Sequence, residues 1–135
     1  MSAIKIRELD HVVLRTPQAE SMVRFYAEVL GCTVERSLDI GLVQLRAGRA
    51  MIDIVPCESE LGRRGGSVPD ENARNMDHFC VRVDPFDEPA IRAHLHQHGI
   101  EAGETSRRYG AEGDGPSIYI QDPDGNTVEL KGPPD

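Results

Sequence analysis

Hydrophobic and polar positions alternate along this chain with two periods, one of two residues and one of three to four, which predict strands and helices respectively. In the first part of the chain, a strand is predicted at residues 10–15. A helix follows it, with apolar side chains at helical spacing from Met22 to Leu30, and Gly31 ends it. Three more strands are predicted at 32–37, 41–46 and 50–55.

Residues 56–75 have no apolar period and are rich in glycine, proline and charge, which is typical of a linker. After it the pattern starts again. The expected elements are a strand at 76–83, a helix at 87–98, a strand at 100–104, a glycine-rich loop at 106–115, a strand at 116–121, a turn at 122–125 and a strand at 126–131.

The two parts look like copies of one unit. Asp10-His11 returns as Asp77-His78, 67 residues later, and Gly31 returns as Gly99, 68 residues later. Similar offsets in both places favour a duplication over coincidence between two ordinary segments. We therefore predict an α+β fold in a single domain, residues 1–135. It is built from two βαβββ modules of about 8–55 and 76–131, joined by a linker at 56–75.

Strand alternation places chemically useful side chains on matching faces of the two modules. Each first strand carries one histidine opposite its apolar face, and each last strand carries one carboxylate. These four residues are His11, Asp53, His78 and Glu129. If the two half-sheets pair about a twofold axis, the four surround one cleft. If they do not pair, each of these side chains simply lies on the solvent-exposed face of its strand.

Imidazole nitrogens and carboxylate oxygens together suit Zn, Ni, Mn, Fe or Co better than Ca, and two histidines with one carboxylate match the facial-triad pattern. The three cysteines are an odd number without C-x-x-C spacing, so neither a disulfide framework nor a cysteine–zinc site is expected. They are expected to be free thiols in a reducing compartment, which indicates the cytoplasm.

Charge and composition limit the classes of partner that the protein can bind. The net charge of −8 repels phosphate backbones and anionic lipid, and six aromatic residues without Trp make a poor platform for stacking bases. No apolar run approaches the roughly 20 residues of a spanning helix, and the first residues do not resemble a signal peptide. A small-molecule partner is expected, with no nucleic acid and no membrane.

Four stretches resemble the vicinal oxygen chelate superfamily: LDHVVLRT at 9–16, FYAEVLG at 25–31, MDHFCVRV at 76–83 and DPDGNTVEL at 122–130. That superfamily includes glyoxalase I, fosfomycin-resistance thiol transferases, extradiol dioxygenases and bleomycin-resistance proteins. The resemblance covers roughly residues 7–131. It implies a half-open mixed barrel of paired modules around a central cleft, one divalent metal ion, and a substrate that chelates the metal through neighbouring oxygens.

The resemblance also implies roles for single residues. His11, His78 and Glu129 fall on the family's metal ligands, and Asp53 falls where glyoxalase I has Glu. The Asp side chain is shorter by about 1.5 Å. Asp53 is therefore expected to ligate directly, to bind through water, or to act as a nearby base. The catalytic proton would be moved by Glu129, or by Asp53 if it is not tightly ligated.

Substrate-binding candidates come from the same comparison. Arg15, four residues after His11, resembles the arginine that clamps a glutathione carboxylate in glyoxalase I, and Arg82 follows His78 by the same spacing. The segment 106–115 resembles a loop of small glyoxalase-like proteins, in which Arg107, Arg108 or Tyr109 would reach the substrate. Tyr119 on the next strand would face the same cleft. The alternative for each is an ordinary surface role.

The leading hypothesis is a metal-dependent glyoxalase, similar to lactoylglutathione lyase, with glutathione or another thiol as co-substrate and a homodimeric assembly. The first alternative is a metal-free small-molecule binding protein of the bleomycin-resistance type. The others are a fosfomycin-resistance thiol transferase and an extradiol dioxygenase. Val13 stands where the fosfomycin enzymes carry Thr, and most extradiol dioxygenases are about twice as long.

Three histidines and one cysteine could also bind metal or react. His94, His96 and His98 form H-x-H-x-H near the end of the second predicted helix, and the negative end of the helix dipole favours them as exposed cations over a metal site. Cys80 is the thiol nearest the proposed ligands, and we expect it to be a small packing residue.

Overall fold

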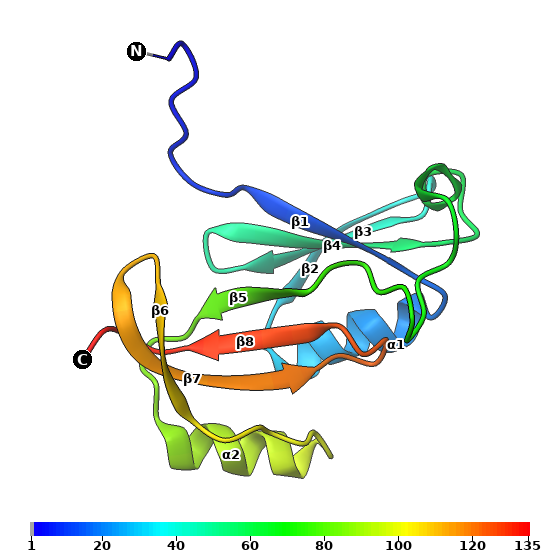
Figure 1. Ribbon diagram of the computed structural model, residues 1–135. Coiled ribbons are helices and arrows are strands. Elements are labelled where there is room, and N and C mark those ends of the chain that lie inside the picture. The colour runs from blue at the N-terminus through cyan, green and yellow to red at the C-terminus, as the bar shows by residue number, and fades with distance from the viewer. Residues whose placement is uncertain (1) are drawn as a thin grey trace. The chain divides into compact units, whose positions relative to one another are not determined.

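The computed structural model describes residues 2–135. The chain divides into two compact units, the first ending at Pro69 and the second beginning at Asp70. Each unit contains one four-stranded mixed sheet (Figure 1). None of the helices between residues 2 and 135 is long and apolar enough to cross a membrane.

The first unit runs strand, helix and three strands. Its elements are β1 (His11–Thr16), α1 (Ala19–Arg24) with a π-helical turn at Phe25–Val29, β2 (Thr33–Leu38), β3 (Leu42–Ala47) and β4 (Ala50–Pro56). The strand order is β1-β4-β3-β2. β1 is parallel to β4 and the other neighbours are antiparallel.

The second unit repeats this order. Its elements are β5 (His78–Arg82), α2 (Glu88–Gln97), β6 (Ser106–Gly110), β7 (Gly113–Gln121) and β8 (Thr127–Lys131). The strand order is β5-β8-β7-β6, and β5 is parallel to β8. The prediction of an α+β fold with two βαβββ modules is therefore confirmed.

The duplication extends to the register of the central strand pair. In the first unit Asp53 lies opposite Val13, two residues after His11. In the second unit Glu129 lies opposite Cys80, again two residues after His78. Because side chains alternate along a strand, each histidine shares a sheet face with the carboxylate of the neighbouring strand. Both modules thus present the same pair of side chains in the same geometry.

The opposite faces of these strands carry the core. In the first unit Leu14, Ile52 and Ile54 are buried, and in the second unit Val128 and Leu130 are. This apolar burial is the main source of stability of each sheet. It also fixes the register, since a slip of one residue would exchange the apolar face with the polar one.

A short turn separates β1 from the first helix. Thr16 is the last residue of β1, where it pairs with Pro56. Its hydroxyl oxygen accepts a hydrogen bond from the Gln18 backbone N–H at 2.9 Å, which forms a turn before α1 starts at Ala19. The extended pairing of Thr16 therefore keeps residues 16–18 out of the helix.

The glycine-rich segment 106–115 was predicted as a loop, and this was wrong. Its first half is β6, and Gly110 pairs with Gly113 to close a hairpin with β7. A side chain at Gly110 would press on the Lys131 side chain, and one at Gly115 would meet the Pro133 carbonyl oxygen at 2.6 Å. Glycine at these two positions therefore makes room for close packing. A second prediction was also wrong, because residues 100–104, expected to be a strand, do not form one.

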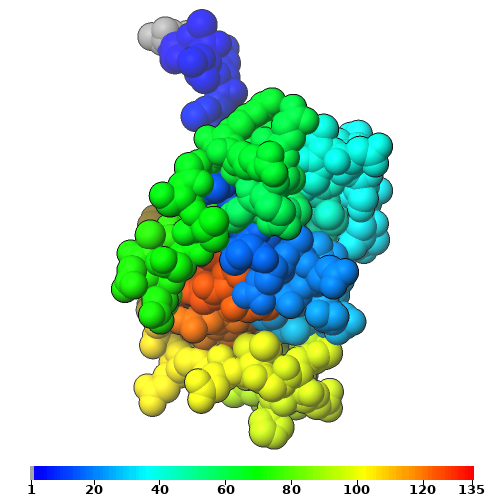
Figure 2. Space-filling view, turned by 90° about the vertical axis from the view of Figure 1, so that its right-hand side faces the viewer, coloured from blue at the N-terminus to red at the C-terminus, as the bar shows by residue number. Residues whose placement is uncertain are grey.

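The segment 56–75 has local structure of its own. A 3-10 helix spans Gly62–Gly65, and an isolated antiparallel bridge joins Asp70 to Ala73. Much of the segment is exposed, and it forms part of the surface drawn in green in Figure 2.

Candidate functional site

The half-site of the first unit is built on β1 and β4. The Nδ1 atom of His11 lies 2.8 Å from Asp10 Oδ2. A carboxylate can only accept, so the ring proton of this bond sits on Nδ1 and the lone pair of a neutral ring is at Nε2. The hydrogen bond that His11 donates to Asp10 raises the pKa of His11, and the charge of Asp53 raises it further.

Asp53 is the carboxylate of this half-site, and only 3% of the residue is exposed. Gln44, directly opposite on β3, approaches Asp53 Oδ2 with its amide nitrogen at 3.3 Å. Asp53 Oδ1 is buried and has no hydrogen-bond partner within residues 2–135. A buried acceptor of this kind costs free energy unless a proton donor or a cation meets it.

The half-site of the second unit is built on β5 and β8. His78 Nδ1 lies 2.6 Å from Asp77 Oδ2, and His78 Nε2 lies 3.4 Å from Glu129 Oε1. The preceding aspartate therefore orients the ring in both units, and here the other nitrogen faces a carboxylate. Asp77 itself is exposed, whereas Glu129 is 6% exposed. An imidazole that binds a metal through one nitrogen usually donates its other N–H to a carboxylate or carbonyl, as His78 does to Asp77.

Glu129 is held from its other side by a row of polar groups across the sheet. The Ser117 hydroxyl donates to Glu129 Oε2 at 2.8 Å, and Arg108 Nη1 lies 3.0 Å from that hydroxyl and 2.9 Å from the Ser117 carbonyl oxygen. The Arg108 guanidinium lies 4.1 Å from the centre of the Tyr119 ring, which meets the His78 ring edge-on. These five residues come from the four strands β5 to β8.

The turn before β8 sets where Glu129 stands. Asp122 is buried, and its Oδ1 atom accepts from the backbone N–H groups of Asp124 and Asn126, both at 2.9 Å. Its Oδ2 atom accepts from the Asn126 side chain at 2.9 Å. Gly125 takes a positive φ of 83°, which suits glycine. The DPDGN sequence thus closes a rigid turn and starts β8 in fixed register.

A hollow of about 690 Å³ opens beside His78, entirely within the second unit. It is lined by Glu71, Asn72, Arg74, Met76, Asp77, His78, Tyr119 and Thr127. Sequence reasoning missed Glu71, Asn72 and Arg74, because they lie in the segment expected to be a linker. The available signal was their position, directly before the Asp77-His78 pair.

A family model described as the Glyoxalase/Bleomycin resistance protein/Dioxygenase superfamily matches residues 8–130. The chain belongs to this superfamily. The resemblance found from the sequence is therefore confirmed.

Three relatives show what the chain is similar to. Glyoxalase domain-containing protein RDO1 of Mycosarcoma maydis is 28% identical over 134 residues, which cover 94% of this chain and 69% of that protein. Virulence protein STM3117 of Salmonella typhimurium is 30% identical over 132 residues, 93% of this chain and 83% of that protein. Glutathione transferase FosA of Serratia marcescens is 27% identical over 125 residues, which cover 93% of this chain and 80% of that protein.

The crystal structure of STM3117 also matches in three dimensions. Its TM-score is 0.81 at 27% identity, with 97% of this chain and 100% of that chain covered. The fold is therefore shared over nearly the full length of both chains.

Arg15, the expected carboxylate clamp, has its guanidinium turned to the backbone of the first unit. It donates to four carbonyl oxygens, those of Gly62, Gly65, Gly66 and Ser67, at 2.8–3.1 Å. These bonds use the donors that a substrate carboxylate would need. Arg15 therefore holds the 62–67 segment against β1, and its role as a carboxylate clamp stays a prediction.

The other predicted substrate residues differ in their surroundings. Arg82 pairs with Glu112 at 2.6 Å, and Arg107 pairs with Asp135 at 2.9 Å. Tyr109 is 82% exposed. Arg108 and Tyr119 share the sheet face of His78 and Glu129, as described above. A substrate role for Arg82 or Tyr109 stays a prediction.

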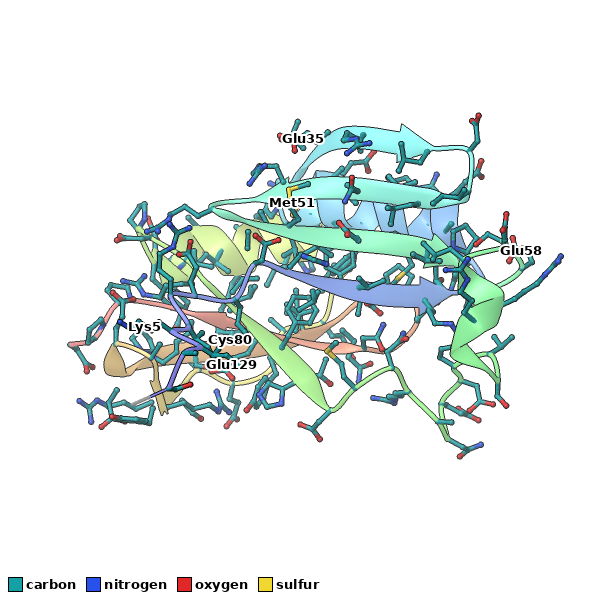
Figure 3. All side chains as sticks on the ribbon, turned by 90° about the horizontal axis from the view of Figure 1, so that it is seen from above. Lys5, Glu35, Met51, Glu58, Cys80 and Glu129 are labelled. Atoms are coloured by element: carbon teal, nitrogen blue, oxygen red, sulfur yellow. The ribbon has the colours of Figure 1, made fainter. Side chains whose placement is uncertain are left out.

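Cys80 lies on the same face as Glu129, on the neighbouring strand (Figure 3). Although the residue as a whole is exposed, its thiol is partly removed from water beside the sheet. This partial burial, with the charge of Glu129 adding to it, raises the pKa of Cys80 to about 11. The thiol is therefore protonated at neutral pH, in keeping with its expected role as a small packing residue.

The donor set of each unit fits the divalent metal that this superfamily implies. Each unit offers one imidazole oriented through Nδ1 and one buried carboxylate, and Asp53 Oδ1 is an acceptor without a partner. Within residues 2–135, no group of three or more His, Cys, Asp or Glu side chains could by itself hold a metal ion. Each unit thus supplies a pair of donors, not a complete coordination shell.

Proposed function

We propose that this protein is a metal-dependent enzyme of glyoxalase type, a lyase or isomerase acting on a small substrate that presents two neighbouring oxygens. One observation carries the proposal: both units place a histidine and a buried carboxylate in the same register, and an aspartate fixes each ring. Chance would not repeat this arrangement in two separate sheets. If these side chains simply lay on solvent-exposed strand faces, Asp53 and Glu129 would not be buried.

The two pairs are proposed to form one metal site, with His11, His78 and Glu129 as ligands and Asp53 beside them, not tightly ligated and so able to act as a base. The pairs would meet within one chain or between the two chains of a homodimer, in which superfamily members often assemble. Light scattering coupled to size-exclusion chromatography would measure the assembly, and a monomeric mass would overturn the dimer.

When bound, the metal would supply Lewis-acid polarisation of two substrate oxygens. The protein's own groups supply the rest. Asp10 and Asp77 keep Nδ1 of each ring protonated and leave Nε2 as the ligand atom. Glu129 has both oxygens engaged, whereas Asp53 Oδ1 has no partner among the described residues. We assign the movement of the substrate proton to that oxygen.

The hollow beside His78 is proposed to hold the substrate. Met76 and Tyr119 give it apolar surface, and Asn72 and Arg74 give it donors. Arg74 makes no hydrogen bond or ion pair with any residue from 2 to 135. Its guanidinium is thus available to an anionic group, which would include a carboxylate of glutathione or another thiol co-substrate.

The test uses protein purified without a polyhistidine tag. Its metal content is measured first, and conversion of methylglyoxal with glutathione is then assayed after reconstitution with Zn, Ni, Mn, Fe or Co. Activity with at least one metal, lost in His78→Ala, supports the proposal. Tight metal binding without this activity would exclude the glyoxalase reaction, and no metal binding would favour a metal-free binding protein.

A second candidate is a thiol transferase of the fosfomycin-resistance type. The observation in its favour is the 27% identity to glutathione transferase FosA. The same reconstituted samples are incubated with fosfomycin and glutathione, and adduct formation is followed by mass spectrometry. Adduct without turnover of methylglyoxal would replace the first proposal by this one. Oxygen consumption with a catechol would instead indicate a dioxygenase.

A further inference from the structure

The two oxygens of the Glu129 carboxylate have different partners. Oε1 faces His78 Nε2 at 3.4 Å, and Oε2 accepts the Ser117 hydroxyl at 2.8 Å. Ser117 is fully buried, and Glu129 nearly so. No water is needed to explain the orientation of the carboxylate, because a protein donor meets it on the side away from His78.

The direction of this hydrogen bond is forced. A serine hydroxyl has one proton to donate, and a guanidinium can only donate. Arg108 Nη1 lies 3.0 Å from the Ser117 hydroxyl oxygen, so Ser117 accepts there and must give its proton to Glu129. The bonds therefore run one way, from Arg108 through Ser117 to Glu129.

Arg108 is itself fixed. The same Nη1 atom donates to the Ser117 carbonyl oxygen at 2.9 Å, and the guanidinium lies over the Tyr119 ring at 4.1 Å. A planar cation on an aromatic face keeps its orientation better than a flexible ammonium would. Arg108 is therefore held by two contacts, one with the Ser117 carbonyl oxygen and one with the Tyr119 ring.

The first unit has no such support. There the residue opposite the carboxylate is Gln44, whose amide reaches Asp53 Oδ2 at 3.3 Å, a longer bond from a neutral donor. The duplicated modules have thus diverged at this point. One carboxylate is held by a charged relay, and the other keeps an oxygen without a partner among the described residues.

We propose that Ser117 and Arg108 are positioning residues that hold Glu129 in the rotamer that faces His78. The role of Glu129 as a metal ligand rests on the proposed function, whereas its fixed orientation does not. The two statements can therefore be tested separately.

The first experiment uses the metal-free full-length protein. Three-bond NMR couplings of the Glu129 side chain report whether it holds one rotamer. We expect one rotamer in the parent and in Ser117→Thr, which keeps the hydroxyl, and averaging in Ser117→Ala and Arg108→Met. The control is Ser106→Ala, since Ser106 is exposed, lies opposite Ser117 in the β6–β7 pair, and its side chain makes no hydrogen bond within the described chain. One rotamer in Ser117→Ala, or averaging in the parent, overturns the proposal.

The second experiment measures Co²⁺ binding and its visible absorption spectrum in the same variants. Loss of a hydrogen bond to a charged group is expected to weaken Co²⁺ binding by about ten- to a hundredfold. The spectrum should change in Ser117→Ala and return to the parent form in Ser117→Thr. Unchanged affinity and spectrum in Ser117→Ala would overturn the positioning role. If the parent binds no Co²⁺, the proposed function fails, and the NMR couplings still decide the positioning role.

Discussion

Asp53 is the residue at which metal binding and stability should oppose one another. Its buried Oδ1 atom has no partner within residues 2–135. In the metal-free protein, Asp53→Asn removes a buried charge, so we expect a melting temperature raised by about 2–8 °C, for a gain of about 1 kcal/mol. In the metal-loaded protein the same change should lower it. Asp39→Asn, at an exposed carboxylate, is the control and should move neither value. Shifts of the same sign in both forms would contradict a ligand or base role for Asp53.

The reactivity of the Cys80 thiol should depend on pH and on the charge of Glu129 beside it. Its pKa of about 11, against an ordinary 9.0, leaves about a hundredfold less thiolate at pH 8. We expect iodoacetamide to alkylate Cys80 slowly in the metal-free protein, with a rate that rises through pH 10. Glu129→Gln removes the neighbouring charge and should speed the reaction at pH 8. Peptide mass spectrometry measures the rate. Rapid alkylation of Cys80 at pH 7, like that of an ordinary exposed thiol, would contradict the prediction.

At the scale of elements, Arg15 joins β1 to the segment that follows β4. Its guanidinium donates to four carbonyl oxygens, and Gly65 has no side chain that would occupy the space of the guanidinium. Arg15→Met should lower the free energy of unfolding by about 1–3 kcal/mol and speed amide hydrogen exchange in residues 62–67. Arg64→Met, an exposed change in the same 3-10 helix, should do neither. Equal protection of this segment in Arg15→Met would show that Arg15 does not hold it.

The β6–β7 hairpin shows why some elements were mispredicted. Glycine at 110, 113 and 115 looks like loop punctuation, but two of these positions accommodate Lys131 and the Pro133 carbonyl oxygen, which are distant in sequence. Period-two alternation predicted β1, β4, β5 and β8 well, because each has one apolar face. It could not show that Arg15 meets a backbone segment, since those partners are main-chain carbonyls without a sequence signature.

A glycine replacement tests this packing. Gly115→Ala places a methyl group 2.6 Å from the Pro133 carbonyl oxygen and 3.1 Å from that of Gly132. We expect a loss of about 1–3 kcal/mol in the free energy of unfolding, since the methyl group must displace backbone. Chemical denaturation measures it. Ending the chain after Gly132 should recover part of the loss, because it removes the nearer oxygen. Full stability in Gly115→Ala would contradict the close packing of Gly115 against the Pro133 carbonyl oxygen.

At the scale of the whole molecule, the duplication is what the sequence revealed most directly. The repeated Asp-His pair and the alternating strands were enough to predict two βαβββ modules and a histidine and carboxylate on one face of each. The structure was needed to show three things: the burial of Asp53 and Glu129, the orientation of both rings by the preceding aspartates, and the hydrogen bonds through Ser117. They depend on side-chain rotamers and on partners in neighbouring strands, which periodicity does not encode.

The duplication also makes a prediction about stoichiometry. If the two pairs form one site, the protein binds one metal ion per site, and His11→Ala and His78→Ala each remove all of it. If each pair binds a metal alone, either variant removes about half. The measurement needs a background of His94→Ala with His98→Ala. The exposed rings of His94, on α2, and His98, directly after α2, have centroids 4.6 Å apart and could bind metal on their own. Elemental analysis after dialysis then gives the ratio. Half-loss in both single variants would contradict a shared site, whereas complete loss in both follows only if each unit supplies part of one coordination shell.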